Sequence, residues 1–142
     1  MSERDPDEVA RLCADAMWAN DPASRDLGME LVGIGPGYAT MAMTIGLSMI
    51  NGHDTAHGGF IFTLADTAFA FACNSRGEKC VAQHCSVSFV RPARRGERLV
   101  ANAHEVFREG RSGIYDVNVS AGDDTIAEFR GHARTVGGSW FE

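Results

Sequence analysis

The chain has 142 residues, of which 44% are apolar and 23% are charged, and its formal net charge is −6. This length suits one domain with its own core, expected over residues 1–142, and the mixed composition argues against disorder. The acidic balance argues against nucleic-acid binding, which normally needs a basic face.

Nothing in the chain predicts export or membrane insertion. The first eight residues are polar and acidic, unlike a signal peptide. The longest apolar stretch is short for a bilayer span and contains an acid. The four cysteines have no export context and are interpreted as reduced thiols. We therefore expect a cytoplasmic protein with no membrane partner.

The first part of the chain predicts a helical lead and two strands. Residues 1–27 form the lead, with a helix from Pro6 to Trp18 that opens on a proline followed by acids. Strands are expected at Leu31–Ile34 and Tyr38–Ile45, joined by a turn of two glycines and a proline. Residues 46–57 are rich in polar and small residues and indicate a loop.

The segment Gly58–Ser75 is apolar around most of its circumference, which is typical of a buried helix. Strand-like runs separated by turn residues follow it. These runs are Lys79–Val90, Arg98–Arg108, Gly113–Ala121 and Thr125–Val136. The order predicts an α+β domain, in which a sheet wraps around one long central helix.

Asp66 is the only charged residue within Gly58–Cys73. A lone carboxylate in such surroundings costs several kcal/mol unless it is partnered or used, and such groups often mark catalysis. The helix opens on Gly58 and Gly59, whose bare N–H groups lie at its positive end. A carboxylate and a polarising amide suit the hydrolysis of an ester or thioester. A hydrogen-bonded structural aspartate is the alternative.

The spacing of these two groups constrains any shared site. Gly58 and Asp66 are eight residues apart, about 12 Å along a continuous helix. One thioester cannot reach both groups on such a helix. Either the helix breaks, which its apolar composition argues against, or the two groups come from different chains of a dimer.

Arginines at 91, 94, 95 and 98 form the densest basic cluster of an acidic chain. A solvated turn between strands is the ordinary fate of such a cluster. The alternative is a phosphate site, because guanidinium groups match phosphate geometry. Arg111 is a weaker candidate for the same role.

Metal binding is not expected. His53 and His57 are four residues apart, but the helical zinc motif needs a Glu after the first His, where this chain has Asp54. Cys80, His84 and Cys85 lack zinc-finger spacing and are interpreted as packing residues.

Several stretches of the chain resemble hotdog-fold thioesterases, and most of all the phenylacetate-degradation (PaaI-type) family. The central match combines residues 51–59, Asn-Gly-His-Asp-Thr-Ala-His-Gly-Gly, with residues 64–70, Leu-Ala-Asp-Thr-Ala-Phe-Ala. Further matching stretches lie at residues 89–93, 113–117 and 129–131. The resemblance covers nearly the whole chain from about Met29 onward.

The resemblance implies an antiparallel sheet around the helix, dimers joined edge to edge, and a homotetramer built as a dimer of dimers. It also implies hydrolysis of acyl-CoA without metal or cofactor, with an aromatic acyl group such as phenylacetyl or hydroxyphenylacetyl.

The roles divide by chemistry. Gly58 N–H would bind the thioester oxygen, and Asp66 would attack as a nucleophile or activate water. Gly59 would let the substrate approach closely. Asn51 matches a family residue that places the water or thioester, although alone it would cap a loop. His57 is assigned to orienting the loop. Among the arginines that would bind CoA (Arg91, Arg94 and Arg95), Arg91 best matches the family pattern.

Two rival functions stay open. Hotdog dehydratases act on hydroxyacyl thioesters with a loop His and a helix carboxylate, which His57 and Asp66 could imitate, although the His-Gly-Gly opening favours hydrolysis. A non-catalytic acyl-CoA sensor would need an output module, for which the N-terminal helix is too small, and it would not need Asp66.

Overall fold

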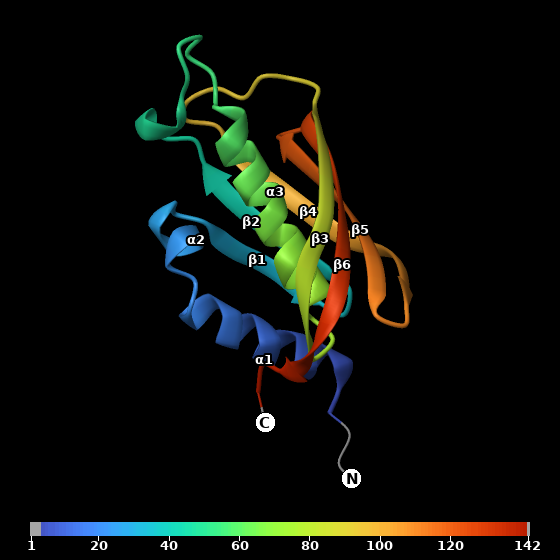
Figure 1. The fold of residues 1–142 in the computed structure, drawn as a ribbon. Helices are drawn as coiled ribbons and strands as arrows, with labels where there is room; N and C mark the ends of the chain where they lie inside the picture. Colours follow the sequence, from blue (N-terminus) through green and yellow to red (C-terminus); the bar gives the residue numbers. More distant parts are fainter. Residues whose placement is uncertain (1–3, 142) are drawn as a thin grey trace.

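The structure is a computed structural model that describes residues 4–141; residues 1–3 and 142 of the predicted domain lie outside the described part. The elements follow the predicted order, with bounds shifted by a few residues at most (Figure 1). They are α1 (Pro6–Ala19), α2 (Pro22–Asp26), β1 (Glu30–Gly35), β2 (Tyr38–Thr44), α3 (Gly58–Cys73), β3 (Glu78–Phe89), β4 (Arg98–Glu109), β5 (Ser112–Ala121) and β6 (Asp124–Ser139). A short 3-10 turn, Leu47–Met49, lies within the predicted loop.

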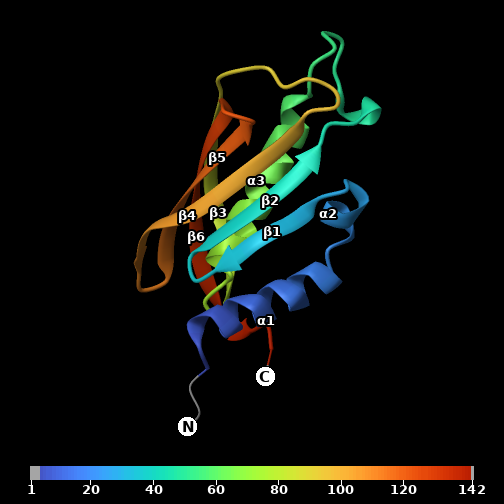
Figure 2. The same cartoon turned by 180° about the vertical axis from the view of Figure 1, so that it is seen from behind.

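The six strands form one antiparallel sheet in the order β1-β2-β4-β5-β6-β3. Tight turns at Gly110 and Gly122, both with positive φ, connect β4, β5 and β6. Strand β3 instead lies at the far edge, where it pairs with β6. It lies there because α3 carries the chain across the sheet before β3 begins (Figures 1 and 2).

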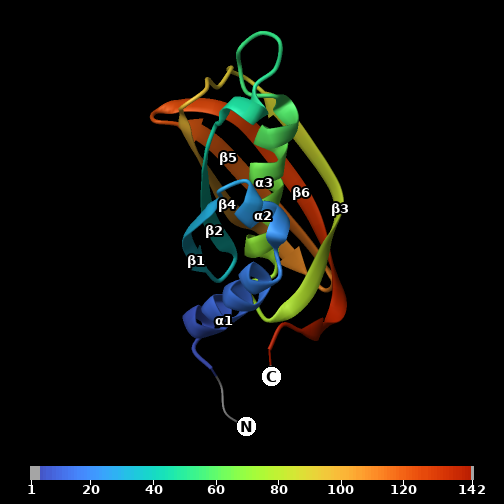
Figure 3. The ribbon, with the colours of Figure 1, turned by 90° about the vertical axis from the view of Figure 1, so that its left-hand side faces the viewer.

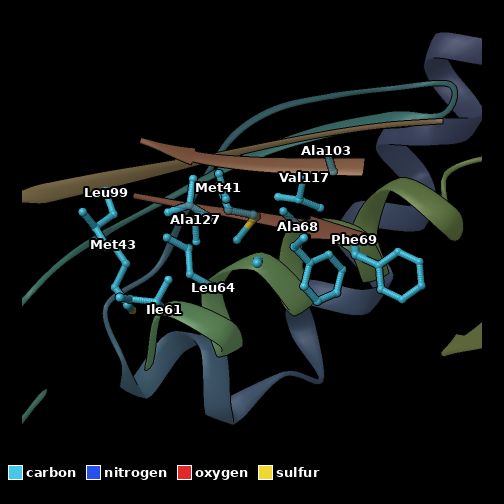
Figure 4. Close-up of a cluster of buried hydrophobic side chains, with 14 of the residues drawn as sticks. Met41, Met43, Ile61, Leu64, Ala68, Phe69, Leu99, Ala103, Val117 and Ala127 are labelled. Atoms are coloured by element: carbon cyan, nitrogen blue, oxygen red, sulfur yellow. The ribbon is translucent and has the colours of Figure 1, made fainter. Parts of the chain in front are cut away.

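Helix α3 lies on the concave side of the curled sheet, as Figure 3 shows. One side of the helix presents buried side chains to the strands, among them Leu64, Ala68 and Phe69. These face Met41 of β2 and Val117 of β5 across the core (Figure 4). Each fully buried large apolar side chain contributes about 1.5–3 kcal/mol. The predicted fold, a sheet wrapped around one long helix, is therefore confirmed.

The opposite side of α3 is not fully buried within one chain, so the prediction of a helix buried all round is wrong for the protomer. The half-buried positions include Phe62, Thr63, Asp66, Thr67 and Ala70, whose spacing places them on one face. The physical reason is that the sheet covers only one side of the helix. We call this face of α3 the open stripe.

The helix ends at Cys73, two residues before the predicted end. The Asn74 side chain caps this end of the helix: its amide donates to the Ala70 carbonyl at 2.9 Å and to the Cys80 carbonyl at 3.2 Å. The Cys80 N–H donates back to Asn74 Oδ1 at 2.8 Å. Asn74 thereby fixes where β3 leaves the helix. Among residues 4–141 there is no helix that is both long and apolar enough to cross a membrane.

Gly131→Ala is expected to destabilise the fold. A Cβ at Gly131 of β6 would lie 2.7 Å from two ring atoms of Phe69, whose ring is also packed against Tyr115 and Phe129. The ring cannot yield without opening the core, so the expected loss is about 1–3 kcal/mol of unfolding free energy. Urea denaturation followed by circular dichroism measures it.

Gly33→Ala in β1 is the matched control, because a Cβ there would meet Thr40 at an ordinary 3.8 Å. We expect its stability to stay within about 1 kcal/mol of the wild type or to rise. Equal losses in the two variants would contradict the steric explanation.

Candidate active site

The first turn of α3 leaves one backbone donor free. The N–H of Gly59 donates to His57 Nδ1 at 2.9 Å, and the N–H of Phe60 donates to the His57 carbonyl at 3.0 Å. The N–H of Gly58 has no acceptor among residues 4–141. Because the helix dipole places positive charge at this end, the Gly58 N–H is suited to bind a developing oxyanion.

His57 is the N-cap of α3. To accept from Gly59, Nδ1 must carry no proton, so the ring is neutral with its proton on Nε2. Its backbone N–H donates to the Met49 carbonyl at 2.7 Å, and its ring contacts Phe60 edge-on. These contacts are those of a residue that orients the loop and the helix start. A part in turnover stays a prediction.

Gly59 has a structural reason to be glycine. A Cβ at this position would lie 3.1 Å from His57 Nδ1, within the space that the imidazole occupies. The His57 cap by itself therefore explains why a small residue is needed at position 59. Close approach of substrate to Gly59 stays a prediction.

Asn51 organises the loop that precedes the helix. Its Oδ1 accepts from the His53 N–H at 2.9 Å, the Thr55 N–H at 3.3 Å and the Thr55 hydroxyl at 3.2 Å. Its Nδ2 has no hydrogen-bond partner within the described chain. Oδ1 of Asn51 thus has the predicted loop-capping role. Nδ2 is free to donate to a water or a thioester.

Asp66 lies two turns into α3, on the open stripe. It is half-buried, and no group among residues 4–141 donates a hydrogen bond to its carboxylate. Burial raises the pKa of Asp66 above its ordinary value. On β3, burial and then the Asp66 charge raise the pKa of Cys85. The carboxylate is therefore close enough to β3 to act on Cys85, and within residues 4–141 it is neither paired nor fully solvated, which is typical of reactive rather than structural acids.

A pocket of about 350 Å³ lies where α3 begins and β3 ends. It is lined by Ala56, Gly58, Ile61, Phe89, Val90, Arg91 and Pro92. The fold therefore brings Gly58 and Arg91 together, although they are 33 positions apart in sequence. Asp66 is not among the lining residues. Helix α3 is continuous over all 16 of its residues, so the broken-helix alternative is wrong.

The arginines predicted to bind CoA differ in whether their side chains contact other groups of the protein. Arg91 donates from Nη1 to the Thr125 carbonyl at 3.1 Å, which aims its guanidinium at the rim of the pocket. Arg94 and Arg95 are exposed, and within the described residues neither side chain has an ion pair or hydrogen bond. Arg98 pairs with Glu30 at 3.5 Å and belongs to the sheet.

Phe89 is a pocket residue that sequence reasoning did not assign to the site. The available signal was an aromatic side chain at a strand end, directly before Val90-Arg91-Pro92. The structure adds that its side chain is 51% exposed and borders Gly58.

Residues 4–141 contain no group of three or more His, Cys, Asp and Glu side chains placed to hold a metal ion. His53 lies in the loop bound by Asn51, and His57 caps the helix. That the site needs no metal stays a prediction.

Comparison with known proteins gives a consistent family. Residues 53–128 match the thioesterase superfamily. The acyl-coenzyme A thioesterase PaaI of Escherichia coli is 41% identical over 127 residues, which cover 89% of this chain and 91% of the relative. Human acyl-coenzyme A thioesterase 13 is 30% identical over 114 residues, covering 77% and 80%.

Solved structures agree. The E. coli PaaI protein, from the phenylacetic acid degradation operon, superposes with a TM-score of 0.93 at 38% identity, over 95% of this chain and 99% of that one. A PaaI variant from Thermus thermophilus superposes with a TM-score of 0.80 at 37% identity, over 82% and 100%. The predicted hotdog fold is confirmed, and the chain belongs to the thioesterase superfamily as a thioester hydrolase.

Proposed function

We propose that this chain hydrolyses acyl-CoA thioesters to a free acid and CoA, with an aromatic acyl group such as phenylacetyl or hydroxyphenylacetyl. The observation that carries the proposal is that, within the described part of the chain, α3 holds both an N–H without an acceptor at Gly58 and a carboxylate without a donor at Asp66. The names of the E. coli and human relatives support CoA as the thiol. The operon of the E. coli protein supports the aromatic acid.

The two groups supply complementary chemistry. The carbonyl oxygen of the thioester accepts a hydrogen bond from Gly58 N–H, which strengthens as negative charge develops on that oxygen. Asp66 either attacks the carbonyl carbon or takes a proton from an attacking water. When Asp66 attacks, the C–S bond breaks to leave an acyl anhydride on Asp66, which a water molecule then hydrolyses to the free acid and the regenerated carboxylate. When water attacks, the water oxygen stays on the acyl carbon, so the free acid forms directly. In both cases the sulfur leaves as the CoA thiolate, which takes up a proton, and water is the source of that proton in the overall reaction. No step requires a metal or cofactor.

Each active site is proposed to combine two chains. Gly58 and Asp66 lie about 12 Å apart along an unbroken helix, so one thioester cannot engage both within a protomer. None of the 12 residues of the edge strand β3 is buried, which is a liability for a strand that stays unpaired. A second copy that covers β3 and the open stripe brings its Gly58 to Asp66. A dimer of dimers completes the proposed assembly.

The remaining proposals concern the binding of CoA and the cellular compartment. Exposed Arg94 and Arg95, with Arg91 at the rim of the pocket, bind the phosphates of CoA. The four cysteines are unpaired thiols, which supports action in the cytoplasm.

The dehydratase alternative uses a loop histidine that exchanges protons with its substrate. In this chain Nδ1 of His57 accepts the hydrogen bond that caps α3, which leaves only Nε2 for that role. A sensor would not require an unpartnered carboxylate on the open stripe. Hydrolysis therefore uses more of the observed features than either rival.

Asp66→Asn is expected to abolish hydrolysis while leaving the fold intact. Loss of the nucleophile or base lowers kcat at least about 1000-fold, equivalent to about 4 kcal/mol of barrier. Release of free CoA thiol from phenylacetyl-CoA measures it. In the wild type the ionised carboxylate is the active form, and burial raises its pKa. Activity should therefore fall as the pH drops, with a midpoint above that of an ordinary aspartate.

Asp54→Asn is the control for that variant, because Asp54 is an exposed loop carboxylate outside the pocket. Near wild-type turnover in Asp66→Asn would remove Asp66 from the mechanism. An absence of turnover in the wild type, across aromatic and aliphatic acyl-CoAs, would refute the proposed function itself.

The joint variant Arg94→Ala/Arg95→Ala is expected to raise KM for phenylacetyl-CoA about tenfold or more, with little change in kcat, since these groups bind the nucleotide alike in ground and transition states. Steady-state kinetics with the N-acetylcysteamine thioester, which lacks the nucleotide, should show no change. Arg11→Ala removes an exposed arginine of α1, outside the pocket, and serves as control. Equal effects on both substrates would exclude nucleotide binding.

Two inactive variants are expected to complement each other. Gly58→Pro removes the amide donor, and Asp66→Asn removes the carboxylate. A heterodimer of the two has both defects in one site and an intact second site, so about half of wild-type activity per heterodimer should return after joint refolding. Thiol release from isolated heterodimers measures it.

Gly58→Pro must first be shown to fold by circular dichroism, although proline is tolerated in a first helical turn. Folded heterodimers without activity would place the whole site within one chain.

A further inference from the structure

We infer that Phe89 is a positioning residue of this reaction: its ring forms the wall opposite the Gly58 N–H and holds the thioester against that amide. The inference rests on the proposed function and assigns a residue that the chemistry above does not use.

The ring and the glycine are in direct apposition. A Cβ built on Gly58 would lie 3.1 Å from Cζ of Phe89, and 3.4 and 3.5 Å from Cε1 and Cε2. The tip of the ring therefore occupies the space beside the Gly58 backbone. Glycine at 58 is required by this ring as well as by the need for an accessible amide.

The ring lines the pocket rather than the core. Within one protomer Phe89 is 51% exposed, although it is a large apolar side chain, and within the described chain it has no aromatic partner. The half-buried Phe62, by contrast, packs on the ring of Phe129. Phe89 shares the pocket lining with the buried Ile61 and the exposed Arg91.

Both walls of the pocket are fixed by backbone hydrogen bonds. Phe89 pairs with Ala127 at the end of β3, and the next two N–H groups, of Val90 and Arg91, donate to the Ile126 carbonyl at 2.9 and 3.2 Å. On the other side, the Ala56 N–H donates to the Ala93 carbonyl at 2.7 Å. The start of α3 and the end of β3 are thus tied to each other, so the separation of their backbones at Gly58 and Phe89 is fixed.

A slot with this form suits a planar group. The thioester lies flat against the ring with its oxygen directed to the Gly58 N–H. The apolar ring keeps water off that side of the amide, which strengthens the hydrogen bond to the oxygen. Because the contact is at the reacting group and not at the nucleotide, Phe89 acts on kcat more than on the binding of CoA.

The test is a double-mutant cycle between Gly58 and Phe89. Gly58→Ala keeps the N–H but places a methyl group against the ring, and the displaced geometry should lower kcat about 100-fold. Phe89→Ala should lower kcat roughly tenfold and Phe89→Leu less. In Gly58→Ala/Phe89→Ala the methyl has room, so the loss should return to about that of Phe89→Ala alone rather than the product of the two.

Phe107→Ala is the matched control, because Phe107 is 45% exposed and lies in β4 outside the pocket. It should keep wild-type kcat. The kcat loss of Phe89→Ala should persist with the N-acetylcysteamine thioester, and thermal denaturation should show all variants folded.

Three results would overturn the inference: unchanged kcat in Phe89→Ala, multiplicative losses in the double variant, or an effect on KM alone that disappears with the truncated substrate. Each is distinct from failure of the proposed function, in which the wild type itself releases no thiol.

Discussion

The unbroken helix α3 is the constraint on which the rest of the structure depends. Sixteen residues without a break hold Gly58 and Asp66 at a fixed separation, and the core fixes the helix against the sheet. On such a helix one thioester cannot contact both the Gly58 amide and the Asp66 carboxylate. The proposed site therefore requires a second copy of the chain, which would cover the open stripe and β3.

The cost of the site is visible in the fold. An apolar helix that keeps one face uncovered, and a half-buried carboxylate with no donor, both lower the stability of an isolated chain. Burial raises the pKa of Asp66, because the apolar surroundings disfavour the charged form of the carboxylate. The buried side of α3, packed on Met41 and Val117, offsets this cost.

Positioning in this site comes mostly from backbone and loop contacts. Asn51 fixes the loop, His57 caps the helix, and the Ala56–Ala93 hydrogen bond ties the helix start to the arginine-bearing turn. Within residues 4–141, an amide N–H, a carboxylate and two exposed guanidinium groups have no partner, and the proposed chemistry uses all four. Rigid surroundings with free reactive groups are what preorganised catalysis requires.

The sequence by itself determined the order of the elements and drew attention to Gly58 and Asp66, because helical and strand periodicity and the lone charge of Asp66 are local signals. Distant contacts were decided only by the tertiary structure. The crossing of α3 moved β3 to the far edge, and the strand pairing brought Phe89 beside Gly58 and Gly131 beneath Phe69. Sequence periodicity does not predict these contacts, because they depend on how separate elements pack against each other. For the same reason the open stripe, which the composition predicted to be buried, emerged only with the fold.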